Sequence, residues 1–319
     1  QYRDAVTEYL HERIRVKEPA NLYEPMVYIL EQGGKRLRPV LVLMATEIFD
    51  CNYKKALDAA LAIEIFHNFS LVHDDIMDDA PIRRGKQTVH EKWDINTGIL
   101  SGDAMLINAY QLFESYEGDT FKELSTLFTK TAIQVCEGQQ YDIDFETRDN
   151  VSIDDYLLMI EYKTAVLVGA SLQMGAIVAG TSKECKEAIY QYGRLLGIAF
   201  QLQDDYLDAF GDPETFGKQA GGDIIENKKT FLYLKTLELA GSSEALQLEH
   251  LYSISPAENS GKIEAVKALF ESSGAAELTR KQIEIYTDKA FRILDKIELP
   301  EAKKAPLRKF GQMLMERQV

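Results

Sequence analysis

Apolar residues recur at steps of three and four along most of this 319-residue chain. The clearest segments are 27–32, 38–49, 56–77, 124–138, 192–210 and 283–297. Such spacing places apolar side chains on one face of an α-helix, and no segment alternates in the way that a half-buried strand does. No linker, compositional break or fixed repeat divides the chain. The pattern therefore predicts an all-α protein, with ten or more helices in one domain over residues 1–319.

The stretch from Thr164 to Thr181 contains no charged residue and could be taken for a membrane span. It falls slightly short of the roughly 20 residues that a bilayer core requires, and Gln173 interrupts it. Gly169 and Gly175 would let neighbouring helices approach closely. We therefore expect a buried helix of a large core and no membrane span.

Composition excludes some functions and compartments. With 45% apolar and 27% charged residues the chain matches a soluble globular protein. Its formal net charge of −15 argues against nucleic acid as a partner, because phosphates would be repelled. Three cysteines without CxxC spacing support neither a disulfide framework nor a zinc site, so we expect a reducing cytoplasm.

Four aspartates gather in "HDDIMDD", at the end of the apolar segment 56–77. Asp74 and Asp78 are four residues apart, which leaves them about 40° apart on one helix face, with Asp75 beside them. Carboxylates this close raise one another's pKa unless a cation lies between them. Mg²⁺ suits such a site, because it takes one or two carboxylates and completes its octahedron with water and phosphate oxygens. A solvated acidic helix end is the alternative interpretation.

The same DDxxD spacing returns in "QLQDDYLDAFGD", as Asp204, Asp205 and Asp208. Two such motifs fit two helices that present acidic turns to one shared cavity. Isolated cations stand elsewhere in apolar or glycine-rich contexts: Lys35, Arg38, Arg83, Arg84, Lys163, Lys218 and Lys228. Each alone would be read as a surface charge. As a set they favour binding of a diphosphate, which an acidic protein can hold only with local cations and metal ions.

These motifs resemble those of the trans-isoprenyl diphosphate synthases, the polyprenyl synthase family. The resemblance rests on "GGKRLRP", "LVHDDIMDDAPIRRGKQTVH", "EYKTA", "FQLQDDYLDAFGD" and "GGDIIENKKT", which extend over nearly the whole chain. It implies the isoprenoid synthase fold, a helical bundle around a central cavity. It also implies condensation of isopentenyl diphosphate with an allylic diphosphate (dimethylallyl, geranyl or farnesyl) by metal-assisted ionisation.

The resemblance implies the site residues position by position. Asp74 and Asp78 would hold two Mg²⁺ ions and Asp204 a third, with Asp75, Asp205 and Asp208 in the same motifs and Mn²⁺ as an alternative ion. The allylic diphosphate would meet Arg83, Lys163, Lys218, Gln201 and Lys228, with Gln139 and Asp142 nearby. Isopentenyl diphosphate would meet Lys35, Arg38, His67 and Arg84. Thr164 and Gln201 would stabilise the carbocation.

The resemblance also bears on product length and assembly. Phe69 and Ser70 lie rather more than one helical turn before Asp74, on the wall along which a product would grow, with Phe66 one turn further. A bulky ring at 69 is typical of short-chain synthases that make farnesyl or geranylgeranyl diphosphate. Family likeness further implies a homodimer.

Two other functions remain open at this stage. Helical terpene cyclases also ionise their substrates with an aspartate-rich motif, although they usually lack the second DDxxD and the "GGKRLRP" element. A non-catalytic subunit of a heterodimeric prenyl synthase would usually carry a damaged motif, whereas both are intact here. A dinuclear iron bundle would need paired Glu-x-x-His motifs, and Glu64 with His67 is a single match.

Overall fold

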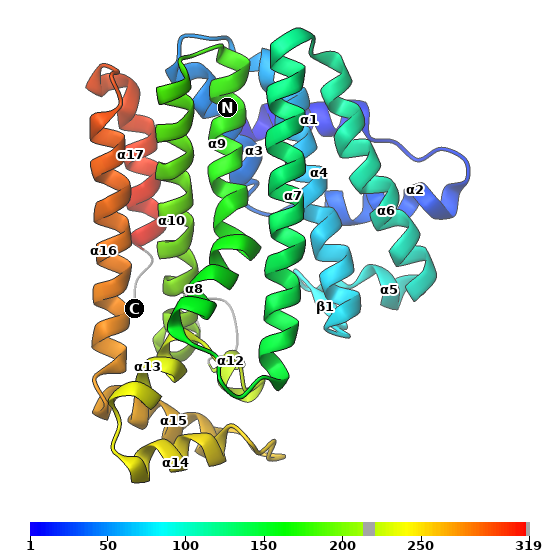
Figure 1. Cartoon of the computed structure of the whole chain (residues 1–319). Helices are drawn as coiled ribbons and strands as arrows, with labels where there is room; N and C mark the ends of the chain where they lie inside the picture. The colour runs from blue at the N-terminus through cyan, green and yellow to red at the C-terminus, as the bar shows by residue number, and fades with distance from the viewer. Residues whose placement is uncertain (213–220, 317–319) are drawn as a thin grey trace. The chain divides into compact units, whose positions relative to one another are not determined.

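The structure is a computed structural model that describes residues 1–212 and 221–316. The described chain is almost entirely helical, which confirms the all-α prediction (Figure 1). It divides into two compact units. Unit 1 comprises residues 1–129 and 170–187, and unit 2 comprises residues 130–169 and 188–319. The single domain expected from the sequence stays a prediction.

The elements of the first half of the chain are α1 (Tyr2–Arg13), α2 (Ala20–Glu31), α3 (Leu37–Ile48), η1 (Tyr53–Ala56), α4 (Leu57–Met77), β1 (Ile82–Arg83), β2 (Lys86–Gln87), α5 (Val89–Lys92), α6 (Ile95–Gln111), η2 (Leu112–Ser115) and α7 (Gly118–Thr147). Those of the second half are α8 (Ile153–Ile160), η3 (Glu161–Ala165), α9 (Val166–Ala179), α10 (Lys183–Phe210), α12 (Gly222–Ile225), α13 (Phe231–Leu239), α14 (Ser242–Leu251), α15 (Ser260–Ser272), α16 (Ala275–Lys296) and α17 (Glu301–Met315). The antiparallel pair β1–β2 has two residues in each strand, which is too short to produce an alternating sequence pattern.

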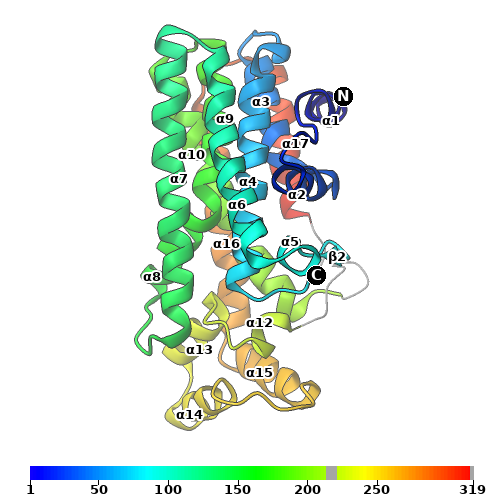
Figure 2. The ribbon, with the colours of Figure 1, turned by 90° about the vertical axis from the view of Figure 1, so that its right-hand side faces the viewer.

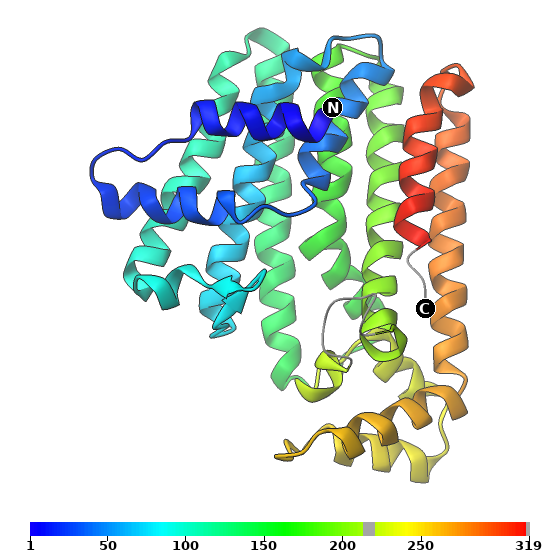
Figure 3. The same cartoon turned by 180° about the vertical axis from the view of Figure 1, so that it is seen from behind.

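Helix α4 is the core of unit 1. Its buried residues lie on all sides of the helix from Ala59 to Phe66, and it contacts α1, α2, α3, α5 and α6. Helix α6 packs along it (Figure 2), while α1 and α2 lie across α3 and α4 (Figure 3). A helix that is apolar all round is stable only when it is enclosed in this way. The acidic end of α4 is thus held on a rigid core helix.

Unit 2 has its own apolar core. Side chains from α8, α10, α13, α14 and α15 form one cluster that includes Tyr156, Leu202, Phe231, Leu248 and Phe270. Helices α16 and α17 lie side by side (Figures 1 and 3). The second acidic segment therefore also sits on a helix with a packed apolar face.

Helix α9 confirms the expectation for the uncharged stretch. The helical run Ile153–Ala179 is long and apolar enough to cross a membrane, but 61% of its apolar window is buried within the protein. A Cβ added at Gly175 would lie 2.3 Å from the carbonyl oxygen of Val42, and one at Gly169 would lie 2.9 Å from that of Tyr190. The small residues therefore serve close helix packing, as expected.

Candidate active site

The first aspartate motif closes α4. Helix α4 ends at Met77, and the amide of Asp78, its C-cap residue, donates to the carbonyl oxygen of Asp74 at 2.9 Å. Asp75 is buried, and both of its carboxylate oxygens accept hydrogen bonds from Arg83, at 2.8 and 2.7 Å. The guanidinium also lies 3.8 Å from Asp74. Of the three carboxylates predicted to hold metal in the first motif, Asp75 is thus held by an arginine, while Asp74 is half-buried and Asp78 is exposed.

A short hairpin carries this arginine back to the helix. Ile82 pairs with Gln87 and Arg83 with Lys86, so the chain reverses at Arg84 and Gly85, which have φ angles of +52° and +75°. Burial lowers the pKa of Arg83, but the hydrogen bonds and charge of Asp75 raise it by more, so the net shift is upward. Arg83 is therefore permanently charged beside the aspartates.

The second arginine of the motif reaches the glycine-rich turn before α3. Nη1 of Arg84 donates to the carbonyl oxygen of Gly33 at 2.7 Å, and a Cβ at Gly34 would lie 3.2 Å from the Arg84 guanidinium carbon. Gly34 also has a φ of +116°, which L side chains rarely adopt. The two glycines thus let the arginine lie over the turn that carries Lys35 and Arg38.

A buried ion pair supports the same turn. Arg36, which has a φ of +48°, donates to Glu64 at 2.9 Å and to the carbonyl oxygen of Leu30 at 2.7 Å. Glu64 also accepts from Asn68 at 3.1 Å. No sequence pattern marks Arg36, because nothing in the order of residues distinguishes a structural arginine from its neighbours. Arg36 and Glu64 fix the backbone from which Lys35 and Arg38 project.

Arg38 and His67 form a hydrogen-bonded pair near the same turn. Nη1 of Arg38 lies 3.2 Å from Nε2 of His67. Because a guanidinium has only donors, Nε2 of His67 accepts, and the ring proton is on Nδ1. Burial, followed by the charges of Arg38, Arg84 and Arg83, lowers the pKa of His67 well below its usual range. Burial also lowers the pKa of Arg38 to about 10, which leaves the guanidinium charged at neutral pH.

The second aspartate motif lies in unit 2, within α10. Asp205 is buried and accepts hydrogen bonds from the hydroxyl of Tyr156 and, at 2.9 Å, from Nε2 of Gln201. The Gln201 amide oxygen in turn accepts from Thr164 at 3.3 Å. Burial, followed by the charge of Asp223, raises the pKa of Asp205 well above its usual range. This network joins three predicted site residues, and it adds Tyr156, which no local sequence signal marks.

Asp208 holds the short helix α12 in place. Its carboxylate accepts from the amide of Asp223 at 2.9 Å, and its carbonyl oxygen accepts from the amide of Gly221 at 2.7 Å. Lys228 lies 2.8 Å from Glu226 and 3.9 Å from Asp223. The structure thus brings the chain after the second motif back onto that motif. Lys218 falls outside the described residues.

Two of the predicted site residues, Lys163 and Asp142, form an ion pair in unit 2. Nζ of Lys163 donates to Asp142 at 2.6 Å. Lys163 lies in η3, a π-helical turn between α8 and α9, and such turns occur frequently at functional sites. A Cβ at Gly138 of α7 would lie 2.3 Å from the backbone nitrogen of Lys163, so only glycine fits against this turn. Gln139, the next residue, is half-buried on the same helix.

The proposed chain-length residues belong to an aromatic cluster in unit 1. The ring of Phe69 lies 5.5 Å from that of Phe66 and 4.9 Å from that of His73. Phe66 in turn contacts Phe128 at 5.1 Å. The small Ser70 is half-buried and donates to the carbonyl oxygen of His67 at 2.7 Å. The structure thus places two aromatic layers successively behind the Asp74 end of α4.

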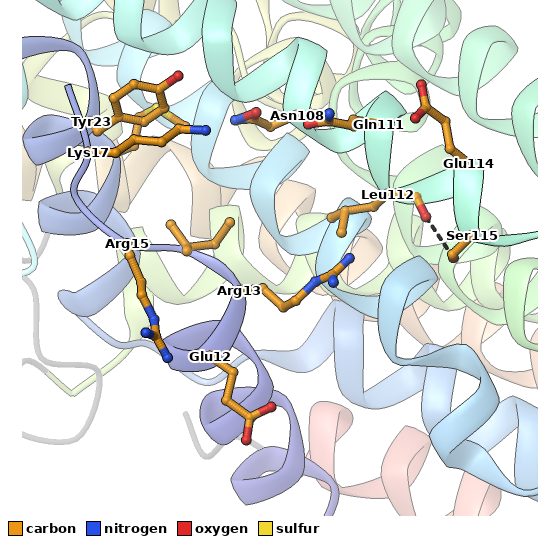
Figure 4. Close-up of a pocket in the computed structure, with 12 residues that line it drawn as sticks. Glu12, Arg13, Arg15, Lys17, Tyr23, Asn108, Gln111, Leu112, Glu114 and Ser115 are labelled. Carbon is orange, nitrogen blue, oxygen red and sulfur yellow. Dashed lines mark hydrogen bonds between the residues drawn. The ribbon is translucent and has the colours of Figure 1, made fainter. Parts of the chain in front are cut away.

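A cavity of about 630 Å³ lies elsewhere in unit 1 (Figure 4). It is lined by Glu12, Arg13, Ile14, Arg15, Lys17, Tyr23, Met26, Asn108, Gln111, Leu112, Glu114 and Ser115. Its cations are already engaged in part, since Arg13 pairs with Asp58 at 3.4 Å and Lys17 lies over the ring of Tyr23. Among the described residues of this lining there is no predicted site residue. We therefore base the candidate site on the aspartate and arginine clusters.

The lowered pKa of His67 predicts a pH-dependent stability. The unfolded chain gains a proton at this histidine as the pH falls through about 6.5, whereas the folded chain does not. Stability is therefore full above that pH and falls below it, by at most about 1.4 kcal/mol per pH unit. We expect urea midpoints measured at pH 7.5 and 5 to differ less in His67→Gln than in the wild type. The exposed His250→Gln serves as control, and an unchanged difference in His67→Gln would contradict the assignment.

Comparisons with known proteins show the family of this chain. A family model described as polyprenyl synthetase matches residues 19–270. Geranylgeranyl diphosphate synthase of Methanosarcina mazei is 39% identical over 268 residues, which cover 82% of this chain and 83% of that protein. A crystal structure of a geranylgeranyl pyrophosphate synthase has 53% identity and a TM-score of 0.96, with 100% of this chain and 98% of that chain covered.

A geranylgeranyl pyrophosphate synthase from Corynebacterium glutamicum, complexed with isoprenyl diphosphate and magnesium, has 27% identity and a TM-score of 0.87, with 99% of this chain and 98% of that chain covered. These similarities confirm the resemblance seen in the sequence motifs. The chain is a prenyltransferase of the short-chain prenyl diphosphate synthase type. It belongs to the polyprenyl synthetase family.

Proposed function

We propose that this prenyltransferase condenses isopentenyl diphosphate with allylic diphosphates, through ionisation of the allylic substrate, and that its product is geranylgeranyl diphosphate. The observation that carries the proposal is the division of the polar residues into two kinds of site. Carboxylates gather at Asp74 and Asp78 and again at Asp204, Asp205 and Asp208, whereas Arg38, His67 and Arg84 form a cationic group around the Gly33–Gly34 turn. These residue types suit one diphosphate bound with metal and one bound without.

The carboxylates fit Mg²⁺, because they are hard oxygen donors at the ends of two helices. Asp74 and Asp78 would hold two ions and Asp204 a third, and magnesium there would stabilise the charge that develops on the departing diphosphate. Arg83, whose pKa is raised, would place a permanent positive charge beside the same leaving group. The terpene-cyclase interpretation is less favoured, because the relatives compared above are named as diphosphate synthases.

Isopentenyl diphosphate would bind at the cationic group of Lys35, Arg38, His67 and Arg84. Neutral His67 accepts a hydrogen bond from Arg38 and so orients the Arg38 guanidinium. The other N–H groups of Arg38 would then bind phosphate oxygens. The turn is already ordered by Arg36 and Glu64, so little further ordering is required when substrate binds. The homoallylic double bond of this substrate would then attack the allylic carbon.

In unit 2, Lys163, Gln201 and Lys228 would contact the allylic diphosphate, with Lys163 directed by Asp142. The carbonyl oxygens of η3 and the amide oxygen of Gln201 offer partial negative charge to the developing carbocation. The new carbon–carbon bond leaves a carbocation on the former isopentenyl unit, and transfer of a proton from it to the released diphosphate would complete the reaction. No side-chain nucleophile is needed in this scheme.

Removal of one predicted metal ligand in each unit tests the reaction. We expect Asp74→Asn and Asp204→Asn to fold normally and to lower turnover roughly 10²- to 10³-fold at saturating Mg²⁺, since each substitution removes charge that acts on the leaving group. Turnover with isopentenyl and dimethylallyl diphosphates is the measurement, with thermal melting as the folding check. The exposed Asp288→Asn of α16 is the matched control. Near-wild-type turnover in either variant would overturn the proposed role of its motif.

Product length is proposed from the aromatic cluster. Phe69 is 8% exposed and lies one aromatic layer before Phe66, and one helical turn rises by about 5.4 Å, comparable with an extended isoprene unit. A ring at this position would stop elongation early, which suits a twenty-carbon product and leaves fifteen carbons as the alternative. The relatives named geranylgeranyl diphosphate synthase support the longer of the two.

Truncation of the first aromatic layer should lengthen the product. We expect Phe69→Ala to make products longer than those of the wild type, with Phe66 as the next stop, measured by chromatography of dephosphorylated products. If Phe69 only packs the core, its truncation would lower the free energy of unfolding by about 3–5 kcal/mol without changing product length. Phe270→Ala, in the core of unit 2, controls for that effect. An unchanged product distribution from a folded, active Phe69→Ala enzyme would refute the role of this ring.

The homodimer is proposed from an exposed apolar stripe on α6. Leu100 and Ile107 are 60% and 67% exposed and lie seven residues apart, on the same face of the helix, with Ile99 41% exposed nearby. Apolar side chains gathered in this way on a surface helix are typical of an interaction site. A second copy of the chain is the occupant that we propose.

The oligomeric state tests this surface. We expect the wild type to sediment as a dimer at micromolar concentration and the double variant Leu100→Glu/Ile107→Glu to sediment as a monomer, because two charges would be buried at the contact. Leu246→Glu, which changes a leucine that is 65% exposed on α14, should remain dimeric. A monomeric wild type, or a dimeric double variant, would exclude this interface.

The cytoplasm is the compartment that we propose for the enzyme. The proposal rests on the three cysteines, Cys51, Cys136 and Cys185, which lack the number and spacing of a disulfide framework. Fractionation of the native cells would test this assignment, and recovery of the enzyme outside the cytoplasm would refute it.

A further inference from the structure

The hairpin β1–β2 has a second cluster of metal-ligand side chains at its base. Asp79 follows the end of α4, and His90 and Glu91 lie in α5, the helix that follows the hairpin. One ligand atom from each of these three residues lies within 4.8 Å of the other two. Asp79 and His90 stand within the first signature segment, but none of the three residues belongs to a DDxxD motif or has a role assigned above. The cluster is thus a candidate site of its own, next to the first motif in sequence.

His90 is the unusual member of this cluster. It is 7% exposed, and neither of its ring nitrogens has a hydrogen-bond partner within the described part of the chain. Nε2 lies 3.9 Å from the Glu91 carboxylate, which is too long for a hydrogen bond. A buried polar group without a partner is costly, so such groups in native proteins usually have a water or an ion beside them. Asp79 and Glu91 are exposed, so solvent ions can reach the two carboxylates beside the buried imidazole.

The backbone around the cluster is well braced. The Thr88 hydroxyl donates to the carbonyl oxygen of Ala80 at 2.7 Å, and its amide donates to that of Pro81 at 3.1 Å. These bonds close the base of the hairpin and hold α5 against the end of α4. On the other side, a Cβ added at Gly98 of α6 would lie 3.7 Å from the Cβ of His90. The three ligand side chains therefore project from a fixed frame, although only one of them is buried.

We propose that Asp79, His90 and Glu91 bind one divalent transition-metal ion of the zinc class. An imidazole nitrogen with two carboxylates is a donor set that zinc accepts, with water in the fourth position, whereas Mg²⁺ prefers oxygen alone. Ligand atoms around tetrahedral zinc lie about 3.3 Å apart, so small rotations of the two exposed carboxylates would close the site. The ion satisfies one nitrogen of His90, and a water would satisfy the other.

The location suggests what such an ion does. It would join the residue after the first aspartate motif to the helix after the hairpin, and so clamp the loop that carries Arg83 and Arg84. Binding of the ion does not depend on the reaction assigned above, because the three residues and their contacts are independent of the substrate. The proposal is therefore tested by measuring binding of a metal ion to the protein in the absence of substrate.

Cobalt is a suitable probe, since it replaces zinc and reports its ligands spectroscopically. We expect the full chain, in a large excess of Mg²⁺ that occupies the aspartate motifs, to bind one Co²⁺. Visible absorption bands and hyperfine-shifted imidazole proton signals would show nitrogen ligation, and zinc would displace the cobalt. Asp79→Asn and Glu91→Gln should each weaken binding by at least roughly tenfold, and His90→Gln should abolish the imidazole signals.

Control variants distinguish this site from Co²⁺ binding at exposed histidines. His250→Gln, which removes an exposed histidine of α14, should leave Co²⁺ binding and its spectrum unchanged. The Asp79→Asn and Glu91→Gln variants change exposed side chains and keep the test valid even if His90→Gln misfolds. Absence of Co²⁺ binding in excess Mg²⁺ would overturn the proposal. So would a nitrogen-ligated ion whose affinity survives both carboxylate substitutions.

Discussion

A carboxylate that leaves water must be stabilised by a cation or by hydrogen bonds, and this constraint shapes the polar interior of the protein. In unit 1 the buried carboxylates are stabilised by arginine side chains. Asp75 is held by Arg83 and Glu64 by Arg36, and each pair is placed by a turn with positive φ angles. The turn before α3 and the β1–β2 hairpin therefore each place an arginine guanidinium beside a buried acid.

Unit 2 meets the same constraint in another way. Asp205 takes hydrogen bonds from Tyr156 and Gln201, and Asp208 takes one from the amide of Asp223. Burial, followed by the charge of Asp223, raises the pKa of Asp205 well above its usual range, and Lys228 opposes that shift only in part. A bound divalent cation would reverse it, because a nearby opposite charge favours the ionised carboxylate. This cluster is thus electrostatically suited to cation binding.

The two arginines of the first motif have different roles although they are neighbours in sequence. Arg83 faces the aspartates, whereas Arg84 faces the Gly33–Gly34 turn. The reversal of the chain between β1 and β2 separates them, because Arg83 ends strand β1 whereas Arg84 lies in the turn, with a φ of +52°. Under the proposed function, one short hairpin would thus present two adjacent cations to two diphosphate subsites.

The sequence by itself determined the helical class, the burial of α9 and the residue types of the site. The spacing of apolar residues and the composition of a segment are local properties, so they can be recognised without knowledge of the tertiary structure. The sequence could not reveal that Asp75 pairs with Arg83, that Arg36 pairs with Glu64, or that Tyr156 contacts Asp205. It also did not single out Asp79 with His90 and Glu91. These facts depend on contacts between residues distant in the chain, and only tertiary packing decides which side chains are close enough to pair.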